Sequence, residues 1–146
     1  MAITTNAIAN SFKKELLEAK HDFTQTSGDQ FKIALYTNSA TLGKSTTSFT
    51  TDHQVSNTGQ YTSGGGKLAK GSQQTSVASS VAIVHFADRS FTGVTLTARG
   101  ALIYNTSNSN TAVAVLDFGG DKTATAGTFT IQFPAFTTSA AILRIS

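Results

Sequence analysis

The sequence predicts an all-β protein, an antiparallel β-sandwich or jelly-roll-like domain that carries one N-terminal α-helix. Three observations lead to this fold class. Ser and Thr make up more than a quarter of the 146 residues. From residue 28 onward, apolar residues recur with the period of two that is typical of strands. No helical period separates these runs, which disfavours a parallel βαβ sheet. The length suits one domain, so we expect an N-terminal helical arm over residues 1–24 and a single β-sandwich over 25–146.

The only stretch with helical spacing lies near the N-terminus, and we expect a helix over residues 3–23. Thr4 and Thr5 are both suitable caps for its start. One face is apolar, because hydrophobic residues recur at i, i+4, i+8 and i+11, at Ile8, Phe12, Leu16 and Ala19. This stripe is too narrow to need burial within the same domain. We therefore expect Ile8, Phe12 and Leu16 to dock on a neighbouring molecule.

A strand is expected over residues 31–36, where apolar residues alternate with others. The segment that follows, residues 37–79, is polar and weakly hydrophobic, so we expect loops with one or two short strands. Long connections of this kind are usually functional or fold against a partner, and we expect this one to gain order against neighbouring molecules. Its Gly64-Gly65-Gly66 run indicates a flexible turn or a close approach of backbone segments.

Strand patterns are dense from residue 81 to the C-terminus. The glycines of Gly119-Gly120-Asp121 predict a turn, and Pro134 ends a strand or places it at a sheet edge. Short strands at this spacing are typical of sandwiches and jelly rolls. The predicted strands cover residues 81–86, 94–98, 101–104, 112–118, 129–133 and 141–145.

The sequence contains no complete motif for catalysis or metal binding. Without cysteine, a disulfide or a Cys-based zinc site is excluded. His85 and Asp88 are a conceivable ligand pair, but a strand histidine hydrogen-bonded to its neighbours is the better interpretation. Gly66-Lys67 matches part of a phosphate-binding loop, but the first glycine and the Ser/Thr of that motif are missing. Asp117-Phe118-Gly119 matches a kinase tripeptide, but the other kinase motifs are missing.

Acidic residues and tyrosines are the remaining candidates for a site. A glycosidase-type site needs two acids on one face, and the candidates are Asp88, Asp117 and Asp121. Acids at strand ends and turns are normally solvated or bonded to backbone amides, which is the better interpretation of these three. No G-x-S-x-G nucleophile motif is present. Of the aromatic residues, the tyrosines are the better candidates for exposure. We therefore expect no enzyme activity, no cofactor and no metal. We also expect Tyr61 to contact a partner, in addition to Ile8, Phe12 and Leu16.

Charge and hydropathy argue against two further partners. The chain has 11 Lys+Arg and 8 Asp+Glu, and its formal net charge of +3 is too diffuse to indicate nucleic-acid binding. No run approaches the roughly 20 apolar residues that span a bilayer. Residues 1–9 also lack the form of a signal peptide. We expect neither nucleic acid nor a membrane as a partner.

Several strings of residues are distinctive, most of them in the C-terminal half. With these strings the chain resembles a family of small virion proteins of tailed bacteriophages over most of residues 5–146. The resemblance implies a capsid decoration, or cement, protein that binds and stabilises the assembled head shell. The alternative is a tail or fibre component that binds a receptor or glycan. The strings are Phe31-Lys32-Ile33-Ala34-Leu35-Tyr36, Gly59-Gln60-Tyr61-Thr62, Phe86-Ala87-Asp88, Leu96-Thr97-Ala98-Arg99-Gly100-Ala101-Leu102-Ile103-Tyr104-Asn105, Ala112-Val113-Ala114-Val115-Leu116-Asp117-Phe118-Gly119-Gly120-Asp121-Lys122 and Phe129-Thr130-Ile131-Gln132-Phe133-Pro134.

The resemblance also implies partners and a location. The main partner is the major capsid protein, and the chain lies on the outer surface of the virion head after synthesis in the host cytoplasm. We expect a homotrimer, because icosahedral shells present three-fold and quasi-three-fold axes and the sparse charge of this chain allows close self-association. A small hydrolase is the alternative from another class, and the missing acid pair and nucleophile argue against it.

Overall fold

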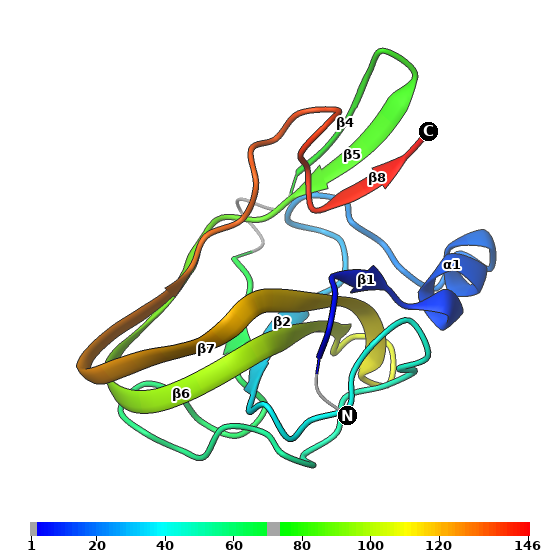
Figure 1. Ribbon diagram of the computed structural model, residues 1–146. Helices are drawn as coiled ribbons and strands as arrows, with labels where there is room; N and C mark the ends of the chain where they lie inside the picture. Colours follow the sequence, from blue (N-terminus) through cyan, green and yellow to red (C-terminus); the bar gives the residue numbers. More distant parts are fainter. Residues whose placement is uncertain (1–2, 70–73) are drawn as a thin grey trace.

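The computed structural model describes residues 3–69 and 74–146, and its regular structure is mostly β. Within those residues it contains one short helix and eight strands, which form two antiparallel sheets (Figure 1). The all-β class is thereby confirmed, although the two sheets are not closed on each other. The elements are β1 (Ala7–Ile8), α1 (Asn10–Leu17), β2 (Phe31–Tyr36), β3 (Gly66–Lys67), β4 (Gln74–Ala78), β5 (Val81–His85), β6 (Arg89–Asn105), β7 (Thr111–Ile131) and β8 (Leu143–Ile145).

The larger sheet has the strand order β1-β7-β6-β2-β3 and is built around the long β6–β7 hairpin. Strand β6 joins two of the predicted strands into one, and β7 joins two others. The predicted turn at Gly119-Gly120 is therefore wrong, because both glycines lie inside β7. The pairing with β6 shifts register near this point, and the positive φ of 79° at Gly119 lets the strand bend without ending. Strand β7 ends at Ile131, as Pro134 predicts.

The smaller sheet has the order β4-β5-β8 and stands beside the larger one (Figure 1). Aromatic side chains join the two sheets in one core. The ring of Phe31 in β2 stacks on Phe23 at 4.5 Å between centroids and lies 5.8 Å from Phe86, which follows β5. Phe86 in turn lies 5.9 Å from Phe133, which follows β7. These contacts fix the smaller sheet to the larger one.

The N-terminal helix is much shorter than the predicted 3–23, because β pairing takes over its first part. Residues of β1 pair with β7, and the Ala9 amide donates to the Val113 carbonyl oxygen at 3.0 Å. Ala9 therefore caps α1 without a side-chain hydrogen bond, and neither Thr4 nor Thr5 has that role. The helix ends where Ala19 adopts a left-handed φ of 58°.

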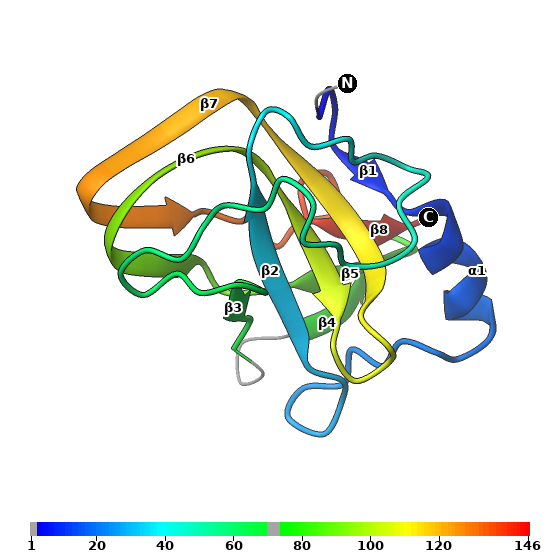
Figure 2. The same ribbon diagram turned by 90° about the horizontal axis from the view of Figure 1, so that it is seen from below.

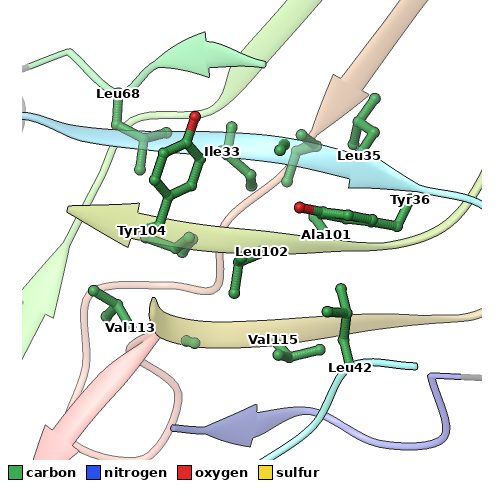
Figure 3. Packing of buried hydrophobic residues seen from close by; sticks show 14 of the residues in the cluster. Ile33, Leu35, Tyr36, Leu42, Leu68, Ala101, Leu102, Tyr104, Val113 and Val115 are labelled. Carbon is green, nitrogen blue, oxygen red and sulfur yellow. The ribbon is translucent and has the colours of Figure 1, made fainter. Parts of the chain in front are cut away.

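The long connection between β2 and β4 is packed on the larger sheet of its own chain, contrary to the expectation that it gains order elsewhere. Its described part, residues 37–69, contains β3 and buries Leu42 and Leu68 in the core with side chains of β2, β6 and β7 (Figure 3). Figure 2 shows this connection crossing the sheet beside β2. The Gly65 backbone passes close to Ile33, so the glycine run marks a close approach of backbone segments.

Candidate docking groove beside the helix

The exposed large hydrophobic side chains of the described residues gather at one place. Leu17 is 91% exposed, Val77 73% and Ile145 58%, and they come from α1, β4 and β8 respectively. All three line one groove of about 760 Å³ between the helix and the smaller sheet. Both ribbon views place α1 and the C-terminal end of β8 on the same side of the molecule (Figure 1, Figure 2). A cluster of exposed apolar side chains in an otherwise polar surface typically marks an interaction site.

One wall of the groove is the helix. Phe12, Leu16 and Leu17 line it from α1, and Ile8 adds an apolar contact from β1. Phe12 is only 3% exposed and packs against Phe23, with the ring centroids 6.0 Å apart. Phe12 thus anchors the helix to the core, while Leu17 extends into solvent from the same helix.

The other wall is one face of the smaller sheet. Strand register places Val77 opposite Ala82, and Ala82 opposite Ile145, so these three residues share a face. Val84 and Leu143 are likewise opposite each other and extend the same apolar face. Because side chains alternate between faces, this wall is mostly apolar, with Thr75 opposite Val84 as its polar member.

The opposite face of the smaller sheet is covered by the segment between β7 and β8. The ring of Phe136 lies 5.3 Å from that of His85, and Arg144 Nη1 donates to the Ser139 carbonyl oxygen at 2.7 Å. The groove face has no such cover within the described residues. The sheet therefore has one face occupied by its own chain and one face open.

Charge in the groove is sparse and of one sign. Lys13 and Arg144 are the charged residues that line it, and no Asp or Glu does so. Neither cation belongs to an ion pair within the described part of the chain. Arg144 is in register with Ile83, and its guanidinium donates to the Ser139 carbonyl oxygen on the covered face of the sheet. The groove is thus largely apolar, and Lys13 is the cation at its border.

The structure brings together three of the four predicted interaction residues. Ile8, Phe12 and Leu16 all line the groove, although Ile8 does so from a strand rather than from the helix. The prediction that this stripe needs no burial in its own domain is wrong for Phe12, because aromatic neighbours from the following loop cover it.

Tyr61 lies elsewhere, and the prediction that the tyrosines are exposed is wrong. Tyr61 and Tyr36 are 0% exposed and Tyr104 is 2% exposed. Each hydroxyl has a hydrogen-bond partner inside the protein, which allows burial of an otherwise polar group.

Sequence reasoning missed Leu17, Val77 and Ile145. Leu17 is one residue outside the predicted helical stripe, and Val77 is an isolated apolar residue in a polar segment. Ile145 lies in the predicted closing strand, and the strand pattern alone gives it no role in binding. Only the pairing of β4, β5 and β8 beside α1 brings the three together.

The candidate chemical residues are separated and engaged in structural contacts. Asp88 Oδ1 accepts the Phe133 amide at 2.8 Å, and Asp121 Oδ2 accepts Asn38 Nδ2 at 3.1 Å. Asp117 bonds Arg99 and accepts the Gly119 amide at 2.8 Å, and this amide, followed by Arg99, lowers the pKa of the Asp117 carboxyl. Among residues 3–69 and 74–146, no group of three or more His, Asp or Glu side chains is arranged to hold a metal.

Comparison with known proteins identifies no relative, since no family model, curated protein or solved structure matches this chain. In the part of the chain that the structure describes, no helix is long and apolar enough to cross a membrane.

Proposed function

We propose that this chain is a capsid decoration protein of a tailed bacteriophage, which attaches to the outer surface of the assembled head and stabilises it. The observation that carries the proposal is the one-sided apolar groove, where Leu17, Val77 and Ile145 are all exposed. The resemblance of the C-terminal strings to small virion proteins supports the same function. In this proposal the protein acts by binding alone, with the major capsid protein as its partner.

Attachment through such a groove suits a protein that is present in many copies. Burial of apolar surface stabilises a contact by about 25 cal/mol per Å² removed from water, so covering Leu17, Val77 and Ile145 contributes to attachment. Linked contacts of several copies raise the effective affinity. Binding only the assembled shell then stabilises that shell by mass action.

We further propose that the protein is a homotrimer and that its two sheets act as the layers of a sandwich-like module. A hydroxyl-rich face of the β6–β7 hairpin supports self-association. Thr97 and Thr123 share a hydrogen bond of 2.9 Å across the two strands, and Ser90 and Thr130 share one of 2.8 Å. All but Ser90 are exposed, so these hydroxyl groups are available to neighbouring copies.

The copy number in purified virions tests the proposed function. We expect hundreds of copies per virion, measured by quantitative mass spectrometry against the major capsid protein, because a decoration protein follows the symmetry of the shell. About a dozen copies or fewer would instead assign the chain to the tail or a fibre and contradict the proposal.

Attachment of purified protein to heads that lack it tests the groove. We expect Leu17→Gln, Val77→Thr and Ile145→Thr each to weaken attachment, while their unfolding curves stay near that of the wild type because all three side chains are exposed. Thr125→Ser, an exposed change on β7, is the matched control and should attach normally. Undiminished attachment of all three groove variants would exclude the groove as the contact.

A further inference from the structure

The charge of the groove restricts what can occupy it. Lys13 lies one helical turn before Leu17, so its ammonium group borders the most exposed apolar side chain of the groove. The ion pairs of α1 involve Lys14, Glu15 and Glu18, and none of them includes Lys13. With no Asp or Glu in the lining, an occupant has to supply the negative charge itself.

A second copy that docks groove to groove does not meet this requirement. A two-fold contact places the same surface on both sides, so each Lys13 meets a surface that contains no Asp or Glu. Like charges brought together at a partly dehydrated interface oppose association. The guanidinium of Arg144 donates to the Ser139 carbonyl oxygen on the covered face of the sheet, so Lys13 is the cation that an occupant of the groove meets.

We infer that the groove receives an apolar segment of a different protein that carries a carboxylate opposite Lys13. Its apolar side chains cover Leu17, Val77 and Ile145, and its carboxylate pairs with the ammonium group at the border. The identity of the partner rests on the proposed function, under which the segment belongs to the head-shell protein. The chemistry of the segment rests on the groove alone.

Overlapping peptides of the head-shell protein, probed with the purified full chain, test this inference. We expect the bound peptides to combine large apolar residues with Asp or Glu. Lys13→Glu should weaken their binding by about tenfold, and replacing the acidic residue of the peptide by Gln should do the same. Lys67→Glu makes an equal charge change on β3, outside the groove, and should leave binding unchanged.

Two results would overturn the inference. One is equal binding of the peptides by the wild type and Lys13→Glu. The other is self-association that is lost in Leu17→Gln while no peptide binds, because that makes the groove a contact between copies. Unfolding curves of Lys13→Glu and Leu17→Gln serve as the control that both variants remain folded.

A second probe separates this inference from the proposed function. The apolar anion 8-anilinonaphthalene-1-sulfonate should bind Lys13→Glu about tenfold more weakly than the wild type, whereas the uncharged dye Nile red should bind both alike. If virions carry the chain outside the head, the proposed function fails but this difference still supports the groove chemistry. If the chain is on the head and both dyes bind both proteins alike, only the inference fails.

Discussion

At the scale of single residues, Asn105 at the end of β6 organises a buried polar network. Its Nδ2 group donates to Asp29 Oδ2 at 2.7 Å and to His21 Nδ1 at 3.0 Å, and its Oδ1 accepts the Ser107 amide at 2.9 Å. Because an amide NH2 only donates, His21 Nδ1 is an acceptor and its proton lies on Nε2, which donates to Glu15 Oε1 at 3.1 Å. One fully buried side chain thus connects α1, the loop before β2 and the β6–β7 turn.

Replacing Asn105 by Leu should lower the free energy of unfolding by about 2 kcal/mol or more, because several buried groups lose their partner at once. Urea denaturation measures this change. Asn38→Ala removes an exposed asparagine with a single side-chain partner and should cost less than about 0.5 kcal/mol. Equal effects of the two substitutions would show that the network contributes little.

Two glycines in the same connection provide a matched pair. Gly65 has a φ of 78°, and a Cβ atom there would lie 1.8 Å from the Ile33 carbonyl oxygen, whereas a Cβ at Gly43 meets nothing within 4 Å. Gly65→Ala should therefore destabilise the protein by more than about 2 kcal/mol. Gly43→Ala should stay within about 1 kcal/mol of the wild type or stabilise it slightly. Thermal and urea unfolding of both variants decide the matter.

At the scale of elements, the polar connection after β2 closes the free edge of that strand. Tyr61 Oη accepts the Leu35 amide at 2.8 Å, and the Val55 amide donates to the Leu35 carbonyl oxygen at 2.9 Å. Strand β3 pairs with β2 further along the same edge. An open edge invites pairing with other chains, so the connection protects the larger sheet.

The buried tyrosines that hold this connection make the protein sensitive to alkali. Burial raises the pKa of Tyr104 to about 12 and also raises the pKa of Tyr36 and Tyr61. Above pH of about 10, tyrosines of the unfolded chain lose protons that the folded state retains. The contribution of these tyrosines to the free energy of unfolding is therefore fully present below a pH of about 10. It should be lost progressively as the pH rises from about 10 towards 12.

Urea midpoints between about pH 8 and 11.5 measure this fall. Tyr104→Phe removes one of the shifted groups, so its midpoint should decrease less steeply with pH, whatever its stability at neutral pH. An unchanged slope would contradict the tyrosine origin of the effect.

The helix has two roles, which one pair of substitutions separates. Phe12→Ala removes a ring that is 3% exposed and should cost about 3–5 kcal/mol. Leu17→Ala removes a side chain that is 91% exposed and should change stability by less than about 0.5 kcal/mol while it weakens attachment to heads. Unfolding curves and head-binding assays of the two variants provide the comparison, and a large loss of stability in Leu17→Ala would refute this division.

At the scale of the whole molecule, sparse charge and a hydroxyl-rich face of the β6–β7 hairpin favour association of copies. Only 13% of the residues are charged, so repulsion between copies is weak. We expect a homotrimer on the shell, and sedimentation together with the arrangement on virions measures it. Three-fold clusters on heads satisfy the prediction even when the free protein is a monomer, whereas a monomer in both settings contradicts it.

Local sequence patterns were sufficient to predict the all-β class, the strand over residues 31–36 and the amphipathic character of the region around Phe12. These features follow from local periodicity, which any strand or helix must obey. The same local rules failed at Gly119-Gly120, because pairing with β6 resumes on both sides of a register shift, at Asp117 and at Lys122, and keeps the glycines inside β7. They failed again before residue 10, where pairing of residues 7–9 with β7 replaces the predicted helix.

Only the tertiary structure decided which apolar residues are free to bind. Tyr61 is buried because Leu35 offers its hydroxyl a partner at a strand edge, a contact between residues that are far apart in the sequence. Leu17, Val77 and Ile145 form one surface because the smaller sheet packs beside α1. Hydrophobic pattern shows which side chains avoid water, but the packing of distant segments decides which of them the chain covers itself.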